Sequence, residues 1–276
     1  MLYEQFGRTE LHSRLPESGT EIRLTAYARP RSGLLADGGE RWAVLILPGG
    51  GYQVTAPTEG EPVALAFLNA GIQAFVLDYS VLPARWPQQL LEAAAALAFI
   101  RRNAEKYGVR PDRIAVCGFS AGGHLAGCLA NLWGDGVIHE TLGLAPGEAR
   151  PDAAILCYPV VTAGAYAIRE CFTRLTGMEK LPPELEKLSL EESVTAKNPP
   201  TFLWSTDMDA TVPVENTMLY AWALRRKGVS VETHIYNRGP HAMGIATAES
   251  AGTAEYTDER AATWQPLAAS WLKTLH

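Results

Sequence analysis

Short, almost continuously apolar runs alternate with longer segments of helical spacing along most of the chain. A run that is apolar at every position is typical of a parallel strand covered on both faces, whereas apolar residues three or four positions apart predict a helix. The predicted strands are 42–47, 72–77, 114–118, 153–157, 201–205 and 231–236, and the predicted helices are 62–70, 88–107, 121–133, 214–227 and 260–275. This alternation predicts an α/β fold, a mostly parallel, doubly wound sheet with helices on both faces.

Two segments depart from this rhythm. Residues 21–28 alternate between apolar and polar positions, which predicts an antiparallel edge strand. Residues 161–200 contain Pro182-Pro183, a charged run at 184–187 and Pro199-Pro200, so we expect a small insertion or lid over the carboxyl edge of the sheet. The whole chain, 1–276, is then expected to form one domain.

Composition narrows the class of protein. The 276 residues include 24 Lys and Arg against 30 Asp and Glu, a net charge of −6, and 47% are hydrophobic, which is ordinary for a globular protein. An acidic chain of this kind is a poor binder of nucleic acid, because it offers no excess of cations to the phosphates. No apolar run reaches the roughly 18 residues that span a bilayer, and the first residues are charged, so we expect a cytoplasmic protein without membrane contact. The four cysteines form no CxxC pair, which argues against a metal site and predicts free thiols.

A candidate nucleophile lies in the sequence Gly118-Phe119-Ser120-Ala121-Gly122, a G-x-S-x-G pattern between a predicted strand and a predicted helix. A serine on such a sharp turn brings the residues two before and two after it close together, and only glycine lacks the Cβ that would collide there. The helix that follows favours negative charge developing near the serine. An ordinary glycine-rich turn remains the alternative.

Three consecutive glycines, Gly49 to Gly51, follow the predicted strand 42–47. Bare backbone at this place offers N–H groups that can bind the oxyanion of an acyl-transfer reaction, and Ala121, after the serine, offers another. A phosphate-binding loop would need a GxxxxGK[ST] lysine, and a dinucleotide-binding turn would need GxGxxG; neither is present. A flexible turn without a catalytic role remains the alternative interpretation.

A serine hydroxyl needs a general base, and that base needs a carboxylate to orient it. Of the six histidines, His241 follows the last predicted strand, where this chemistry is assembled, while His124 lies one helical turn after Ser120 and is expected to be structural. Asp207 and Asp209 both follow the preceding strand, and their positions favour Asp209 only slightly.

The chain resembles the bacterial acetylesterase and acetylxylan-esterase-like branch of the α/β-hydrolases, which is related to the hormone-sensitive-lipase-like esterases. The matching segments are LPGGGY (47–52), EGEPVA (59–64), GFSAGGHLA (118–126), DATVPVEN (209–216) and PHAMG (240–244). The resemblance implies an α/β-hydrolase fold with Ser120 as nucleophile, His241 as base and Asp209, not Asp207, as acid. It also places the oxyanion donors at Gly50, Gly51 and Ala121. The related lipases begin the glycine turn with His where this chain has Pro48, which shifts the match toward sugar esters.

The resulting hypothesis is a serine carboxylesterase that needs no cofactor or metal and hydrolyses short-chain acyl esters, above all acetyl esters of sugars and xylo-oligosaccharides. Its partner is a small-molecule ester, and a homo-oligomer is left open. We expect Tyr52, Trp86, Tyr158 and Met243 to line the mouth of the site, although each residue type also packs in cores. A non-catalytic ligand-binding module on the same scaffold and a peptidase or amidase are the alternatives.

Overall fold

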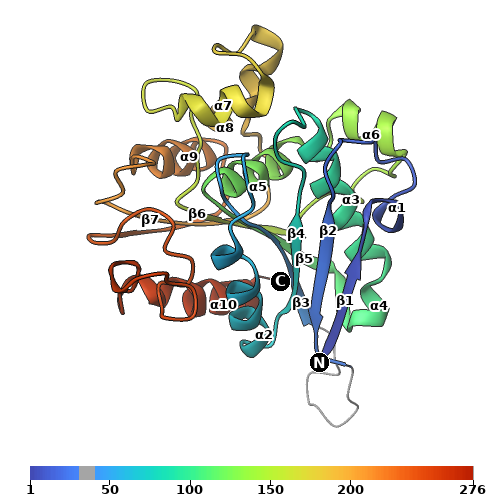
Figure 1. Cartoon of the computed structure of the whole chain (residues 1–276), viewed down its shortest axis with the longest axis horizontal. Coiled ribbons are helices and arrows are strands. Elements are labelled where there is room, and N and C mark those ends of the chain that lie inside the picture. The colour runs from blue at the N-terminus through green and yellow to red at the C-terminus, as the bar shows by residue number, and fades with distance from the viewer. Residues whose placement is uncertain (31–40, 276) are drawn as a thin grey trace.

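The computed structural model describes residues 1–30 and 41–275, and within these ranges an eight-stranded sheet forms the centre of the molecule (Figure 1). The strands are β1 (Leu2–Phe6), β2 (Arg23–Ala28), β3 (Arg41–Leu47), β4 (Gln73–Asp78), β5 (Val109–Phe119), β6 (Ala153–Cys157), β7 (Thr201–Thr206) and β8 (Val231–Tyr236). Their order in the sheet is β1-β2-β4-β3-β5-β6-β7-β8. β2 runs antiparallel to both of its neighbours, and all other pairs are parallel. The predicted mostly parallel, doubly wound α/β fold is confirmed.

Helices cover both faces of the sheet. They are α1 (Arg8–Leu11), α2 (Glu61–Asn69), α3 (Gln88–Arg102), α4 (Ala104–Tyr107), α5 (Ser120–Leu132), α6 (Gly136–Leu142), α7 (Arg169–Thr176), α8 (Leu190–Ser193), α9 (Glu215–Arg226) and α10 (Trp264–Thr274). In Figure 1, α2 and α10 lie below the sheet, α5 and α9 lie above its left part, and α3 and α6 lie at the right.

The central strands feed two hydrophobic cores, one on each face. Along β3, Ala43, Leu45 and Leu47 belong to the core under α3 and α5, while Val44 and Ile46 belong to the core under α2 and α10. Successive side chains of a strand point to opposite faces, so a strand buried on both sides must be apolar at every position. This is why the central strands read as continuous apolar runs in the sequence.

The prediction of an edge strand at residues 21–28 was wrong in position. β2 is antiparallel, as expected, but it lies between β4 and β1, and β1 forms the edge. β1 has the sequence LYEQF, with side chains that alternate between half-buried and exposed. A five-residue strand whose two polar residues, Glu4 and Gln5, are adjacent shows no alternation of apolar and polar residues, so it carries too weak a signal to be found before its pairing partner is known.

Two helix predictions needed smaller corrections. The predicted helix 88–107 is broken at Asn103 into α3 and α4, and it ends at Gly108, which has the left-handed φ of +63° that the glycine predicts. The predicted helix 260–275 starts with a 3₁₀ turn, Ala261–Thr263, before α10 begins at Trp264.

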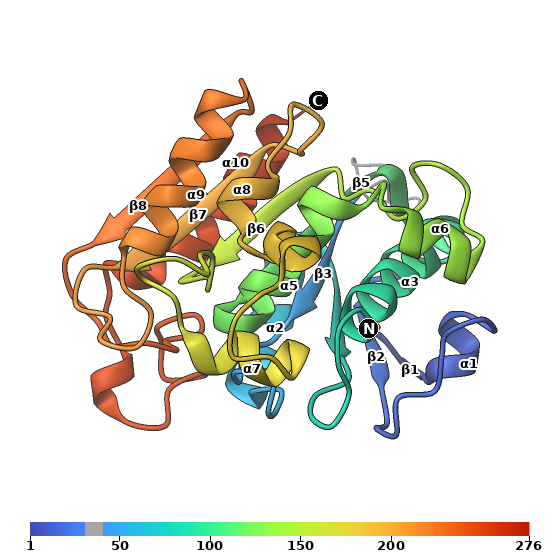
Figure 2. The same cartoon turned by 90° about the horizontal axis from the view of Figure 1, so that it is seen from above.

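Residues between β6 and β7 lie outside the sheet and contain α7, a 3₁₀ helix (Pro183–Leu188) and α8. Figure 2, seen from above, shows α7 and α8 beside α5. α8 packs closely on α5: a Cβ added to Gly127 of α5 would lie only 2.4 Å from Leu190 Cδ1 of α8. Among the residues described, no helix has both the length and the apolar character needed to cross a membrane.

Candidate active site

The turn from β5 into α5 holds Ser120 in a strained position. Ser120 has a φ of +52°, a conformation rare for residues other than glycine. A Cβ on Gly118 would lie 2.1 Å from the carbonyl oxygen of Gly122, and a Cβ on Gly122 would lie 2.1 Å from that of Leu47. Both distances are far inside van der Waals contact, so both glycines of the pattern are sterically required.

The imidazole of His241 reaches Ser120 from the loop after β8. His241 Nε2 lies 2.8 Å from Ser120 Oγ, and His241 Nδ1 lies 2.6 Å from Asp209 Oδ2. A bond from Nδ1–H to the carboxylate leaves Nε2 unprotonated, so Nε2 can accept the hydroxyl proton of Ser120. The structure therefore brings together three side chains that lie up to 121 residues apart in the chain.

Asp209 is held by its own loop. Its Oδ1 accepts the backbone N–H groups of Thr211 at 2.9 Å and Val212 at 2.8 Å, which leaves Oδ2 facing His241. The Asp209 side chain is 1% exposed, whereas Asp207 is exposed. Of the two carboxylates after β7, Asp209 is therefore the one that meets the histidine.

The glycine turn after β3 lies beside Ser120. Gly50 and Gly51 have φ values of +123° and +63°, and a Cβ on Gly49 would come within 3.0 Å of Ser120 Cβ. Over residues 1–30 and 41–275, no protein acceptor takes the N–H of Gly50 or Gly51. Ala121 is fully buried and is the second residue of α5, directly after Ser120.

A cavity of about 280 Å³ opens over these groups. Its lining residues are Gly50, Gly51, Ala56, Glu59, Ser120, Val160, Ile168, Glu170, Cys171, Arg174, Thr211, Val212, His241 and Ala242. The segment between β6 and β7 contributes one wall through Ile168, which directly precedes α7, and through Cys171 and Arg174, which lie three residues apart on one face of α7.

The predicted mouth residues do not line this cavity, which is a correction. Tyr52, Tyr158 and Met243 are each at most 1% exposed, and Trp86 packs against the core that contains α3. The side chains of these residues turn into the protein instead, where large apolar groups are most stable. The α7 residues that form the wall belong to no motif, so sequence reasoning had no signal by which to find them.

His124 has a structural place, as predicted. Its Nδ1 lies 2.7 Å from the Tyr52 hydroxyl and its Nε2 lies 2.8 Å from the Leu188 carbonyl oxygen. Since a carbonyl only accepts, Nε2 carries the proton and Nδ1 accepts from Tyr52. Burial lowers the pKa of His124 to about 4, so the ring is neutral near pH 7.

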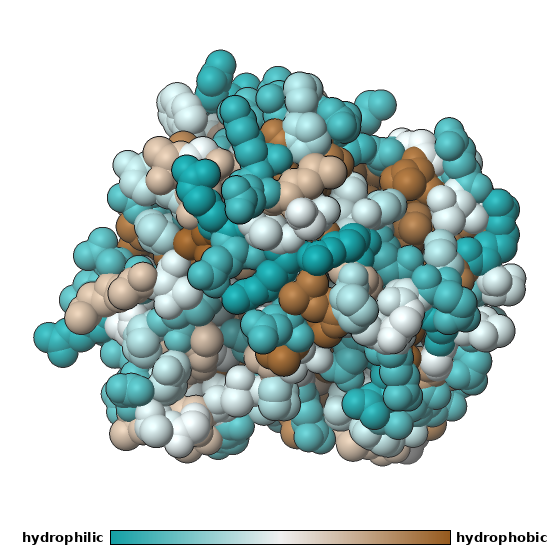
Figure 3. Space-filling model, turned by 45° about the horizontal axis from the view of Figure 1, so that its top comes forward, coloured by the Kyte–Doolittle hydropathy of each residue, from teal (hydrophilic) through white to brown (hydrophobic). Residues whose placement is uncertain are grey.

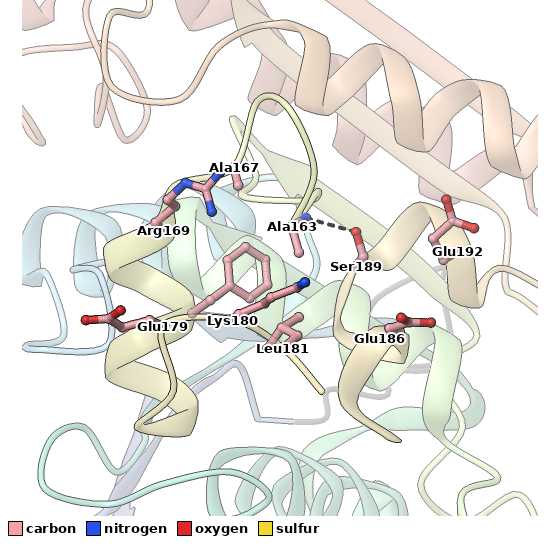
Figure 4. A pocket seen from close by; sticks show the side chains of 10 residues that line it. Ala163, Ala167, Arg169, Glu179, Lys180, Leu181, Glu186, Ser189 and Glu192 are labelled. Atoms are coloured by element: carbon pink, nitrogen blue, oxygen red, sulfur yellow. Dashed lines mark hydrogen bonds between the residues drawn. The ribbon is translucent and has the colours of Figure 1, made fainter. Parts of the chain in front are cut away.

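A second cavity, of about 400 Å³, lies against another face of α7 (Figure 4). Arg169 and Phe172 of α7 line it together with the charged side chains of Lys180, Glu186 and Glu192. Ser189 Oγ accepts the N–H of Ala163 at 2.8 Å and closes one side of it. No member of the Ser120, His241 and Asp209 group borders this space.

A doubly wound sheet, a serine on a strained strand–helix turn and a histidine bonded to a buried aspartate are the features of an α/β-hydrolase. Comparisons with known proteins agree. Residues 37–151 match the family model described as BD-FAE, and residues 152–264 match that of the prolyl oligopeptidase family.

Similarities to individual proteins indicate which branch of the family the chain belongs to. The chain is 34% identical to the acetyl ester-xyloside bifunctional hydrolase from Caldicellulosiruptor lactoaceticus, with a TM-score of 0.78 over 92% of this chain and 88% of that one. It is 39% identical to endo-1,4-beta-xylanase B of Butyrivibrio fibrisolvens over 76% of this chain, and 29% identical to the acetylxylan esterase of Xylanibacter ruminicola over 74%. It spans only 34% and 42% of the lengths of these two curated relatives. The chain belongs to the acetylxylan-esterase-like branch of the α/β-hydrolases.

Proposed function

We propose that the chain is a serine carboxylesterase that removes short acyl groups, chiefly acetyl, from sugars such as xylo-oligosaccharides. The observation that carries the proposal is the continuous relay from Ser120 Oγ through His241 to Asp209, at 2.8 and 2.6 Å. A hydroxyl, an imidazole and a carboxylate in this order form the proton-transfer unit of acyl-transfer catalysis.

In the proposed mechanism, Ser120 Oγ attacks the ester carbonyl carbon while His241 Nε2 takes the hydroxyl proton. The N–H groups of Gly50, Gly51 and Ala121 would donate to the oxyanion of the tetrahedral intermediate. His241 then gives its proton to the leaving alcohol, and an acyl group stays on Ser120. A water molecule then attacks the acyl carbonyl while His241 takes one of its protons. As the acid leaves, His241 returns that proton to Ser120 Oγ.

The size of the cavity and the polar groups at its rim fit a small substrate that carries hydroxyls. Its volume of about 280 Å³ lies at the lower end of small-molecule sites. Arg174 and the exposed Glu170, paired at 3.0 Å on its rim, offer a donor and an acceptor to sugar hydroxyls. The face that is turned forward in Figure 3 is mostly hydrophilic, with separate small hydrophobic patches, and a lipase lid would need a broad apolar area. We propose that the segment 161–200 caps the site with this polar rim.

The names of two relatives support the same substrate class. The structural neighbour is called an acetyl ester-xyloside hydrolase and one curated relative an acetylxylan esterase. Both names join an acetyl group to a xylose-based alcohol.

A substrate panel tests this proposal. Acetylated xylo-oligosaccharides, p-nitrophenyl acetate and a long-chain triglyceride are compared, with the Ser120→Ala variant as the control for every rate. We expect acetate release from the first two, little turnover of the third, and a loss of about 10⁴-fold or more in Ser120→Ala. Full turnover by the Ser120→Ala variant would exclude Ser120 as nucleophile.

A peptidase or amidase is a second candidate, because residues 152–264 match the prolyl oligopeptidase family model. The same relay could attack an amide. The hydrolysis rates of an acetyl ester and an acetyl anilide that carry the same aromatic leaving group decide between the two reactions. A non-catalytic binding module is tested by a fluorophosphonate, which labels only an activated serine.

A further inference from the structure

Glu59 is a buried carboxylate that the relay of Ser120, His241 and Asp209 does not use. It ends a 3₁₀ helix (Pro57–Glu59), is 1% exposed and borders the cavity together with Ser120 and His241. Burial raises the pKa of Glu59, and hydrogen bonds from Tyr158 and Gly49 act in the opposite direction. A buried carboxylate persists only where its oxygens are bonded, so its partners indicate what it does.

Both oxygens of Glu59 accept hydrogen bonds. The N–H of Gly49 donates to Oε2 at 2.7 Å, and the hydroxyl of Tyr158 donates to Oε1 at 2.7 Å. The Tyr158 oxygen in turn accepts the N–H of Gly244 at 2.9 Å. Because the only proton of that hydroxyl points to Glu59, the chain of bonds runs in one direction and ends on the carboxylate.

This series of hydrogen bonds connects the glycine turn to the loop that carries His241. Gly49 starts the glycine turn, and a Cβ there would meet Glu59 Oε2 at 2.7 Å and Ser120 Cβ at 3.0 Å. Gly244 lies three residues after His241, in the loop that carries the imidazole. The ring of Tyr158 also contacts the His241 ring edge to face, with 5.1 Å between the centroids.

Backbone strain occurs on the Tyr158 side of this arrangement. Tyr158 has a φ of +36° and Ala242, next to His241, has a φ of +66°. Each such conformation costs about 1–3 kcal/mol in a residue other than glycine and persists where the surroundings hold it, often at functional sites. Here the N–H of Tyr158 donates to the Trp204 carbonyl at 2.6 Å, and its hydroxyl is held from both sides.

We propose that Glu59 and Tyr158 form a positioning pair that fixes the glycine turn and the His241 loop relative to each other. This inference rests on the proposed function. With the pair intact, the N–H groups of Gly50 and Gly51 and the imidazole of His241 can address the same carbonyl. Neither member of the pair needs to touch the substrate. Positioning errors of about 1 Å at such groups reduce rates by about 10²-fold.

The test uses the isosteric variants Glu59→Gln and Tyr158→Phe in the full chain. Each keeps its shape but removes the link, since the amide of Glu59→Gln cannot accept at both ends and the phenyl ring of Tyr158→Phe has no hydroxyl. We expect each to lower kcat for p-nitrophenyl acetate about 10- to 10³-fold with KM changed less than about threefold. The double variant should lose little more than the worse single variant, because both break one chain of bonds.

Glu92→Gln is the matched control. Glu92 is a fully buried glutamate that accepts from Ser80 N–H at 2.7 Å and Ser80 Oγ at 2.6 Å, and it does not border the cavity. It should lower the thermal midpoint and leave kcat unchanged. All rates are measured below the midpoint of the least stable variant, with folding followed by circular dichroism.

The rate of labelling of Ser120 by a fluorophosphonate separates the possible failures, because it reports serine activation without any ester substrate. The pair is supported if the labelling rate falls with kcat in Glu59→Gln and Tyr158→Phe. The proposal is overturned if kcat and the labelling rate of both variants stay within about twofold of the parent chain, or if only KM rises. It is also overturned if Glu92→Gln lowers kcat as much as these variants do. If the parent chain is labelled by the fluorophosphonate but does not hydrolyse sugar esters, only the proposed substrate is contradicted. If the parent chain is never labelled, both the proposed function and the positioning pair are contradicted.

Discussion

The carboxylate of Asp209 lies 2.6 Å from His241 Nδ1, while Asp207, two residues earlier in the same loop, is exposed. The two N–H groups of Thr211 and Val212 occupy the other oxygen of Asp209 and fix its direction. A two-residue offset in one loop thus separates the carboxylate that can orient the imidazole from one that meets solvent.

Replacing Asp209 by Asn should reduce kcat by about 10⁴-fold, because the amide favours the wrong tautomer of His241 and cannot stabilise its cation. Asp207→Asn is the matched control and should stay within about twofold of the parent chain. Steady-state rates on p-nitrophenyl acetate measure both. Equal losses in the two variants would mean that Asp209 has no special role.

Replacing Gly122 by Ala should destabilise the fold by roughly 2–3 kcal/mol and remove most activity, because the new Cβ would lie 2.1 Å from the Leu47 carbonyl oxygen. That oxygen belongs to the sheet and cannot move far, so the serine turn must shift instead. Gly134→Ala is the control, since nothing lies within 4 Å of its Cβ position. Urea unfolding and ester turnover are measured on both variants, and a fully active Gly122→Ala would contradict the elbow geometry.

His124 should make the protein less stable in acid. Burial lowers its folded pKa from 6.5 to about 4, so between these values the unfolded chain binds a proton that the folded chain does not. The stability contributed by neutral His124 is therefore complete above pH 6.5 and is lost as the pH falls toward 4, by about 3 kcal/mol in total. The free energy of unfolding, from urea titrations, should fall between pH 6.5 and pH 4 by about that amount more in the parent chain than in His124→Gln. Parallel curves would show that another group causes any acid sensitivity.

Filling the cavity from α7 should narrow the substrate range. Cys171 lies in the wall with 5% exposure, and a Cys171→Phe side chain would occupy part of the roughly 280 Å³. We expect kcat/KM for butyryl and hexanoyl esters to fall at least about tenfold more than for acetyl esters, because the excluded volume matters most for large substrates. Cys171→Ala should keep the parent preference. The prediction fails if the acyl-chain profile of Cys171→Phe matches that of Cys171→Ala.

Much of the fold could be predicted from local pattern. The central parallel strands appeared as apolar runs because each is buried on both faces, and Gly108 marked a helix end because it takes a left-handed φ of +63°. β1 could not be found in this way, since LYEQF becomes a strand only through its pairing with β2. The break at Asn103 was also missed, because the helical spacing continues across it.

The candidate site divides along a similar line. Ser120, His241 and the glycine turn are recognisable in the sequence because their chemistry requires particular residue types in a particular order. The cavity wall is different: Ile168, Cys171 and Arg174 are ordinary residues that reach the site only because α7 packs there. Tyr52 and Tyr158 lie beside the motifs, yet their side chains turn inward.

The amino-acid sequence by itself determined the α/β class, the strained serine turn and the order of the three reactive residue types, because these depend on local periodicity and on the absence of a Cβ. Only the tertiary structure decided which strand forms the edge, which side chains enclose the cavity, and that Glu59 connects the glycine turn to Tyr158. The bonds of Glu59 join segments 10 and 99 residues apart, and local periodicity does not encode which distant segments meet.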